Sequence, residues 1–452
     1  MSTLPSPTST STESIPGRTR ALLGISLGYF MVLLDMTVLS VAEPDLAASL
    51  GSSIAGLQWV TTGYTISFAA FLLSAGAIAD RYGAHRVFRY GTAGFGALSL
   101  LSAFAPDLVT LVALRVALGM AAAACVPASM AMIAQLYPEP ARRARAIASW
   151  AAISGAAVAA GPIAGGALVG LAGWRSIFVV NAPIAVLVLA LSAGAAVTCP
   201  RGEGRIDWPA QLAAAIVLAL CTDALIAGGA QSWRHCALSA VGAVLATVTF
   251  ALLEQRSTAP VLNRALLRSR RVCAGLSAGA AVNFALSGAL FVLPLLLQQQ
   301  RQLSPLHTGL AFLPLTVPFA VIPPFAGRLV ARIGPARPIL AGLSLLAAGG
   351  AVLGVAVFAA AGYPILATGL LLSGFGVAFA LPALVAAIVN AAPAGTAGSV
   401  GGMLNAVRQV GATLGVAIMG MSAGTGIGWS LLISAGVCAT AAALFAAAGT
   451  TG

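Results

Sequence analysis

Long apolar runs recur along almost the whole chain, and they constrain its fold more than any other feature. Each run holds about 20 residues, enough for a helix to cross a bilayer core of about 30 Å. The runs are continuous and do not alternate between apolar and polar residues, which argues against the strands of a membrane barrel. The sequence therefore predicts an all-α polytopic membrane protein with no room for a sizeable soluble domain.

Loop signals between the runs divide the chain into about fourteen transmembrane spans. Their expected limits are 21–43, 56–79, 87–105, 109–130, 145–170, 175–198, 208–229, 237–253, 273–297, 308–331, 338–361, 365–388, 399–420 and 428–448. The first run lacks a convincing cleavage site, so we expect it to remain as the first transmembrane helix. The Ser/Thr/Pro-rich segment before it is expected to be a disordered tail.

Arginine alone supplies the basic charge, because the chain contains no lysine and has a formal net charge of +12. Charged residues make up 8% of the chain, against about 25% in soluble domains. Binding to nucleic acid would need basic residues clustered on a solvated domain, so we expect no nucleic-acid partner. The positive-inside rule instead places such residues in short cytoplasmic loops.

A topology with both termini in the cytoplasm sorts these arginines well. Eighteen of them fall in inside loops, three fall outside (Arg175, Arg234 and Arg301), and two lie within spans (Arg115 and Arg408). This bias predicts the orientation. The richness in Ala, Gly and Arg without Lys also suggests a G+C-rich bacterial genome, and hence the cytoplasmic membrane of a bacterium.

The chain repeats itself at an offset of 250 to 255 residues. The stretch "GAIADRYGAHR" (76–86) is similar to "GRLVARIGPAR" (327–337), because Gly, Arg, Gly and Arg recur at the same spacing. Gly119 and Pro127 recur as Gly374 and Pro382, and Gly161 and Gly165 recur as Gly411 and Gly415. Three matches in the same order indicate a duplication, which is the architecture of a transporter whose halves rock around a site between them.

The repeat and the loops together predict five segments. They are a disordered cytoplasmic tail (1–20), a first six-helix half (21–200), an inserted transmembrane hairpin (201–255), a basic cytoplasmic loop (256–272) and a second six-helix half (273–452). A two-helix insertion preserves the orientation of the second half.

Three stretches together carry a resemblance to a known family. The loop after the second span, "GAIADRYGAHR", is similar to the signature G-x-L-a-D-r-x-G-r-k, and "GAAVAAGPIAGGAL" in the fifth span is similar to G-x5-G-P-x2-G-G. In the first span, "LDMTVLSVAEP" is similar to L-D-x-T-V-V-N-V-A-L-P. From about residue 20 to 448 the chain resembles the fourteen-helix drug:proton antiporters of the major facilitator superfamily, which include many drug and antibiotic-resistance exporters.

The resemblance implies a conformational latch in the loop after the second span. Its residues here are Gly76, Asp80, Arg81, Gly83 and Arg86. Gly76 would let two helices approach closely, while the charges would hold one conformation against a neighbouring helix. The family's Arg-Lys near the end is here His85-Arg86. A solvated run of charges is the alternative.

The glycine-rich stretch of the fifth span corresponds to the antiporter signature. Its residues are Gly155, Gly161, Pro162, Gly165 and Gly166. Glycines allow close helix packing, and the proline frees a carbonyl group and kinks the helix. A small-residue run that serves only packing is the alternative.

Asp35 and Arg115 stand inside apolar spans, where a charge is expensive and normally has a partner. Asp35 lies eight residues, or about 12 Å, before the outer end of its span, and Arg115 lies about 9 Å from the outer end of the fourth span. We therefore expect them at a similar height, where protonation of Asp35 would release Arg115 and couple protons to transport. A static ion pair that fixes helix packing is the alternative.

Other polar residues are weaker candidates. Glu43 stands beside Pro44 at the expected membrane surface, so we interpret it as a hydrated surface charge, with tuning of cation access as the alternative. Asp223 falls in the hairpin, where a proton role is doubtful. In the second half, Asn283 could hydrogen-bond substrate, and Asn405, Arg408 and Gln409 either contact the latch loop or line the inner cavity.

The leading prediction is a monomeric, proton-coupled antiporter that exports small hydrophobic drugs or antibiotics by alternating access. An importer or exporter of an endogenous metabolite is the alternative within transport. An enzyme would need a nucleophile with a base or clustered metal ligands, and neither pattern appears, so we expect no cofactor and no metal. The six cysteines are isolated and are expected to serve packing. Substrate, protons and the lipid bilayer are the expected partners.

Overall fold

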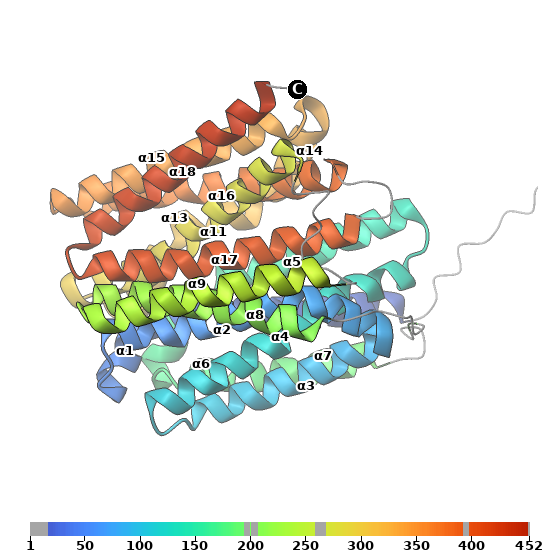
Figure 1. Cartoon of the computed structure of the whole chain (residues 1–452), viewed down its shortest axis with the longest axis horizontal. Coiled ribbons are helices and arrows are strands. Elements are labelled where there is room, and N and C mark those ends of the chain that lie inside the picture. Colours follow the sequence, from blue (N-terminus) through green and yellow to red (C-terminus); the bar gives the residue numbers. More distant parts are fainter. Residues whose placement is uncertain (1–16, 194–198, 200–206, 258–267, 392–396, 451–452) are drawn as a thin grey trace, which may run out of the picture.

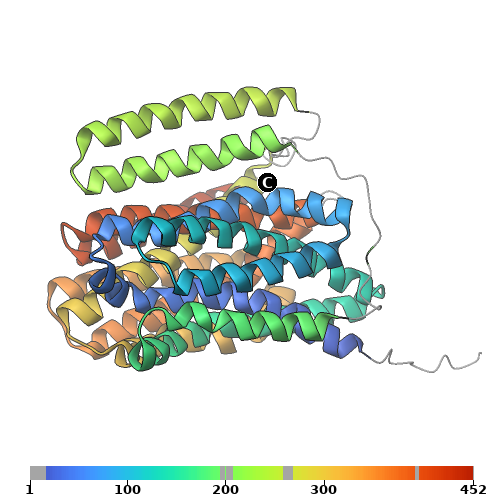
Figure 2. The same cartoon turned by 90° about the horizontal axis from the view of Figure 1, so that it is seen from below.

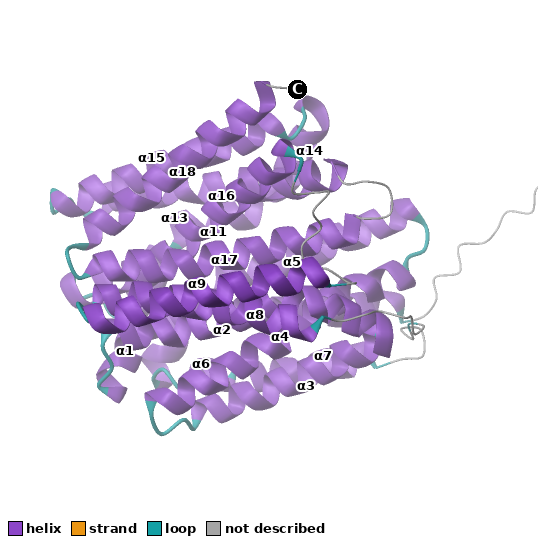
Figure 3. Ribbon diagram, in the orientation of Figure 1, coloured by secondary structure: helices purple, strands orange, loops and turns teal. Residues whose placement is uncertain are grey.

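The computed structural model describes residues 17–193, 199, 207–257, 268–391 and 397–450. This part of the chain contains helices and no strand (Figure 3), so the predicted all-α class is confirmed. The helices run side by side along one common direction (Figure 1).

The helices follow the chain in three groups. The first half contains α1 (Arg18–Leu50), α2 (Ile54–Tyr82), α3 (Ala84–Ala103), α4 (Leu108–Leu136), α5 (Pro140–Ala172), α6 (Ser176–Val179) and α7 (Asn181–Ser192). The hairpin contains α8 (Trp208–Gly229) and α9 (Trp233–Arg256). The second half contains α11 (Arg270–Leu295), the π-helical η2 (Leu296–Gln300), α12 (Pro305–Ala311), α13 (Leu313–Val321), α14 (Pro323–Ile333), α15 (Ala336–Phe358), α16 (Tyr363–Ala391), α17 (Ala397–Ala423) and α18 (Ile427–Thr450).

Each expected span has a helical counterpart, but not every one is apolar enough to qualify as a membrane span on its own. Among the described residues, nine helices are long and apolar enough to cross a membrane, or up to eleven if two bent pairs each count as one span. The predicted count of about fourteen is therefore not fully confirmed. The predicted boundary between residues 200 and 201 lies outside the described residues, as do most of the predicted tail (1–20) and of the predicted basic loop (256–272).

Prolines divide two of the expected spans. The span expected at 308–331 consists of α12, α13 and α14, and its axis bends by 59° between α13 and α14. Pro314 and Pro323 stand at these breaks, where a missing N–H removes a helix hydrogen bond. The span expected at 175–198 begins as α6 and α7, and Pro183 likewise cannot donate to Val179.

The repeated glycines make equivalent close contacts in the two halves. A Cβ atom on Gly119 of α4 would overlap the backbone of α2, and one on Gly374 of α16 would overlap the backbone of α13. In the same way, Gly165 of α5 lies against the Val38 carbonyl of α1, and Gly415 of α17 lies against the Phe284 carbonyl of α11. The sequence repeat is therefore a repeat of helix pairs that only glycine lets approach.

The bundle has two distinct ends. We name the basic end as the one where α1 begins at Arg18 and α2 ends near Arg81, and the far end as the one where α1 ends at Leu50. The start of α1 and the end of α18 lie at the same end (Figure 1), as an even number of crossings requires.

The hairpin lies on one flank of the bundle (Figure 2). Helix α8 packs against α2 of the first half and α17 of the second half, and α9 packs against α8. In the most apolar segment of α9, only 11% of the residues are buried, against 83% in the most apolar segment of Arg270–Gln300, which comprises α11 and η2. The hairpin is therefore peripheral and exposes most of its apolar surface.

Candidate functional site

Asp35 of α1 and Arg115 of α4 form an ion pair inside the first half. An Nη atom of Arg115 contacts Oδ2 of Asp35, and the two residues are 2% and 1% exposed. The sequence placed both residues at one height, and the structure brings them into direct contact. In surroundings this dry, each charge depends on the other to offset the cost of removing it from water.

Hydrogen bonds to two other helices, α7 and α2, complete the pair. Asn181 of α7 donates to Oδ1 of Asp35 at 3.0 Å and to the hydroxyl of Ser99 on α3 at 3.0 Å. Arg115 Nε donates to the carbonyl oxygen of Val60 on α2 at 3.1 Å. Such additional bonds are what allow a buried ion pair to be tolerated.

Aromatic rings close the remaining sides of the guanidinium group. Its central carbon lies 4.4 Å from the ring centre of Tyr64 and 6.0 Å from that of Phe178. Both rings are fully buried. A cation against ring faces gains electrostatic stabilisation without any access to water.

The sequence interpretation missed Asn181, Ser99 and Tyr64 as parts of this cluster. Asn181 does carry a signal, because an amide within an apolar span is costly and normally has a hydrogen-bond partner. Ser99 and Tyr64 carry none, since a lone serine or tyrosine in an apolar helix is usually a packing residue.

The latch residues lie at the basic end of the bundle. Asp80, Arg81 and Arg86 are exposed, and within the described part of the chain Asp80 has no ion-pair partner within 4 Å. Gly83 ends α2 with φ of 90°, a conformation that favours glycine. The expectation that Gly76 permits a tight helix contact is wrong in this conformation, because a Cβ atom there would meet nothing closer than Pro127 at 3.9 Å.

The antiporter signature connects α5 to both halves of the protein. On one side, Gly161 and Gly165 lie against Thr37 and Val38 of α1. On the other side, a Cβ atom on Gly166 would overlap the Pro305 carbonyl at the start of α12.

Two further points concern the same signature. The Pro162 carbonyl lies against Gly309 of α12, so this part of α5 meets the second half without side chains in between. Gly155 lies apart from these contacts, since an added Cβ atom would stand 3.8 Å from Phe319, an ordinary packing distance.

Hydrogen bonds also join the halves toward the far end. Gln58 of α2 donates to the carbonyl oxygens of Val416 and Ala417 of α17 at 3.1 and 2.8 Å. Gln298 of η2 donates to the Val41 carbonyl of α1 at 2.9 Å. These contacts close the seam between the halves at that end.

The polar candidates of the second half form a cluster of their own. Arg408 Nε donates to Asn283 at 3.2 Å, and an Nη atom of Arg408 donates to Asn405 at 3.0 Å. Gln409 is buried at 6% exposure, and its Oε1 has no hydrogen-bond partner among the described residues.

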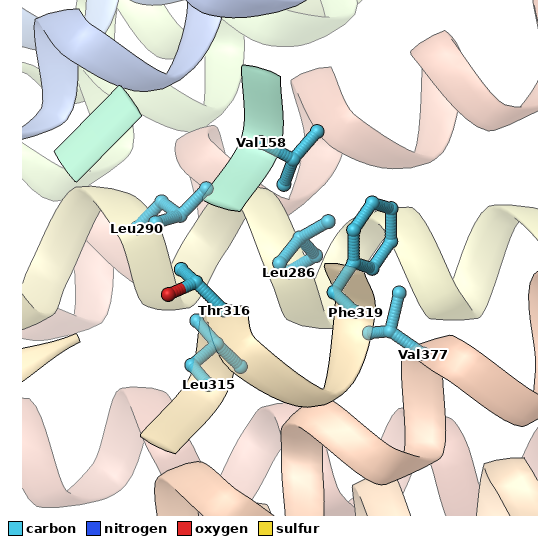
Figure 4. Close-up of a pocket in the computed structure, with 7 residues that line it drawn as sticks. All are labelled: Val158, Leu286, Leu290, Leu315, Thr316, Phe319 and Val377. Carbon is cyan, nitrogen blue, oxygen red and sulfur yellow. The ribbon is translucent and has the colours of Figure 1, made fainter. Parts of the chain in front are cut away.

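A small apolar pocket lies between the halves (Figure 4). It is lined by Val158 of α5 and by Leu286, Leu290, Leu315, Thr316, Phe319 and Val377 of the second half. A second small pocket shares Leu286, Leu315 and Val377 and continues into the second half. Among the described residues, the Thr316 hydroxyl has no hydrogen-bond partner. The lining is therefore apolar apart from this one hydroxyl group.

Two acidic residues differ in their surroundings. The interpretation of Glu43 as a hydrated surface charge is wrong, because it is only 1% exposed and accepts a hydrogen bond from Thr61 of α2. Asp223 lies in the peripheral hairpin, where it accepts a hydrogen bond from Ser239 and contacts His235 at 2.8 Å.

No group of three or more His, Cys, Asp or Glu side chains that could hold a metal ion occurs within the described ranges. No disulfide bond joins the cysteines in the part of the chain that the structure describes.

Comparison with known proteins gives the family. Residues 25–416 match the model of the Major Facilitator Superfamily. The chain belongs to the major facilitator superfamily. It is therefore a multi-pass membrane transporter.

Several relatives within the major facilitator superfamily are named for drug resistance. The chain is 35% identical to the multidrug resistance protein Stp of Mycobacterium tuberculosis over 88% of this chain and 74% of that protein. It is 32% identical to the tetracenomycin C resistance and export protein of Streptomyces glaucescens over 90% of this chain and 76% of that protein. It is 33% identical to the methylenomycin A resistance protein of Streptomyces coelicolor over 88% of this chain and 84% of that protein.

Solved structures show the same major facilitator fold. A bacterial homologue of the human lysosomal transporter Spinster, in an inward-facing and unoccupied conformation, superposes with a TM-score of 0.72. The alignment covers 97% of this chain and 98% of that one at 19% identity. This likeness supports the fold alone.

Proposed function

We propose that this protein is a proton-coupled antiporter that exports small hydrophobic drugs or antibiotics across the cytoplasmic membrane of a bacterium. The relatives named for multidrug, tetracenomycin C and methylenomycin A resistance support the class of substrate. The apolar lining of the cavity between the halves supports a hydrophobic ligand. The proton gradient supplies the energy, and the transporter acts as a monomer without a cofactor.

The buried pair of Asp35 and Arg115 is the observation that carries this proposal. A proton on Asp35 would cancel its attraction for Arg115 and leave the guanidinium charge without its counter-ion in a dry site. That state is costly in the present conformation and favours one in which Arg115 finds other partners. Proton binding can therefore shift the balance between two conformations, which is what coupling requires.

The arginine distribution supports a cytoplasmic location for the basic end and for both termini. With this orientation the far end faces outward and is sealed in the present structure. The latch residues Asp80, Arg81 and Arg86 would then pair with their neighbouring helix when the basic end closes.

A transport assay in energised membrane vesicles tests the proposal. A panel of hydrophobic drugs is offered to vesicles that contain wild type or Asp35→Asn. The wild type is expected to accumulate at least one drug in inverted vesicles when a pH gradient is imposed. The amide variant is expected to lose uphill accumulation and its dependence on pH.

A second measurement separates loss of coupling from loss of folding. Asp35→Asn should still exchange labelled drug for unlabelled drug across the membrane without any gradient, because exchange needs the cavity and not the proton. Uphill export by Asp35→Asn with a normal pH dependence would show that Asp35 is not the coupling group.

A further inference from the structure

Glu43 is a buried carboxyl group that the Asp35–Arg115 pair leaves without a role. It lies on α1 at 1% exposure, about 12 Å along the helix from Asp35. The Thr61 hydroxyl of α2 donates to its Oε1 at 3.0 Å. Its Oε2 is buried and has no hydrogen-bond partner among the described residues.

The charges around Glu43 argue that it is neutral in this conformation. Arg115 is the cation that acts on it electrostatically, but Arg115 already pairs with Asp35 and donates to the carbonyl of Val60. That pair has no net charge. An ionised Glu43 would therefore add an unpaired negative charge to a dry interior, which is far more costly than a neutral carboxyl group.

The other helices packed against α1 offer no second cation near Glu43. The sequences of α6, α7 and η2 contain no charged residue. The charged residues of three further helices stand at their basic ends, and they are Asp80 and Arg81 of α2, Arg142, Arg143 and Arg145 of α5, and Arg270 and Arg271 of α11. His307 of α12 is exposed. On α1 itself, Asp45 accepts a hydrogen bond from the backbone N–H of Trp174 and is a like charge.

Glu43 also stands at the seam that holds the halves together. Two residues before it on α1, the Val41 carbonyl accepts the hydrogen bond from Gln298 of the second half. One turn before Thr61 on α2, Gln58 binds the backbone of α17. Separation of the halves at the far end would therefore open the surroundings of Glu43 to solvent.

We propose that Glu43 is a second proton-binding site, which takes up a proton from the outer solution while the halves are separated at the far end, still carries it in the present conformation, and releases it toward the basic end later in the cycle. This inference rests on the proposed function. Each transport cycle would then move two protons, one through Asp35 and one through Glu43. The proton on Glu43 is bound and released at oxygen, with no covalent change to the substrate.

Infrared difference spectroscopy of the purified protein tests the protonation state directly. A protonated carboxyl group has its own C=O stretching band, which shifts when its proton is replaced by deuterium. We expect this band at neutral pH in wild type and in Asp35→Asn, and its loss in Glu43→Gln. Persistence of the whole band in Glu43→Gln would overturn the inference, whatever the protein transports.

Proton stoichiometry tests the consequence for transport. Wild type, Glu43→Gln and Glu43→Leu are reconstituted in liposomes, with the membrane potential clamped at zero and ethidium as the probe. The amide keeps an acceptor for Thr61, and leucine restores the aliphatic residue of the family pattern. With one proton fewer, the equilibrium gradient of ethidium should fall about tenfold for each unit of pH difference in both variants.

The outcomes separate the two proposals. A wild type whose ethidium gradient ignores the pH gradient contradicts the proposed function itself. A coupled wild type with unchanged stoichiometry in both variants overturns the role of Glu43 alone. A higher KM for ethidium with unchanged stoichiometry would instead make Glu43 a recognition site for cationic substrates, and would also overturn the inference.

Discussion

Gly161 of α5 lies so close to Thr37 of α1 that a Cβ atom on the glycine would stand 2.6 Å from the Cβ atom of the threonine. The Gly161→Ala variant should therefore lose about 1–3 kcal/mol of stability from overpacking. Thermal unfolding in detergent measures the loss. Gly155→Ala is the matched control from the same signature, and it should be neutral or slightly stabilising, since alanine fits there and favours the helix. Equal effects of the two substitutions would contradict the packing.

The Asp35–Arg115 pair predicts a strong thermodynamic coupling. Either Asp35→Asn or Arg115→Leu alone leaves one buried charge without its partner and should cost about 3–5 kcal/mol. The double variant removes both charges and should cost less than the sum of the single changes. The measurement is the free energy of unfolding in detergent of wild type, the two single variants and the double variant, which together form a double-mutant cycle. Simple additivity would mean that the two residues do not interact.

A pair of hydroxyl groups marks a contact between α2 and α17. The Oγ1 atoms of Thr65 and Thr413 lie 2.7 Å apart, so cysteines at both positions should form a disulfide under mild oxidation. The bond would hold the halves in the present conformation and stop transport, and a reductant should restore it. Peptide mapping by mass spectrometry identifies the bond against the six native cysteines. Thr65→Cys alone serves as the control and should transport with or without the oxidant.

The hairpin carboxylate should be dispensable for coupling. His235 is 58% exposed, so its contact with Asp223 is a solvated pair worth at most about 1 kcal/mol. Asp223→Asn keeps an acceptor for Ser239, and export and its pH dependence should remain at the wild-type level in the vesicle assay. A loss of uphill export with normal folding would show that protons pass through the hairpin.

The sequence predicted the meeting of Asp35 and Arg115 because both depths follow from a fixed helix rise and from the orientation that the arginines indicate. It could not predict the burial of Glu43, since that depends on α2, on α4 and on the closed seam with the second half. The same limit applies to Gly76. Its motif suggested a tight contact, but the close approach between α2 and α4 occurs at Gly119, against the backbone of Tyr64. The sequence pattern along one helix predicts the height and the helix face at which a residue lies. Which side chains are buried depends on helices from distant parts of the chain.

The far-end seam is made largely of main chain. Gly166 meets the carbonyl of Pro305, Gly309 meets the carbonyl of Pro162, and Gln58 reaches carbonyl groups rather than side chains. Carbonyl groups are common to every residue, so most substitutions on the facing side chains leave this closure intact. Mutations that reshape the cavity for a new compound can therefore accumulate without a matching change in the gate. A transporter built this way can change the residues that line its cavity while the closure at the far end stays the same.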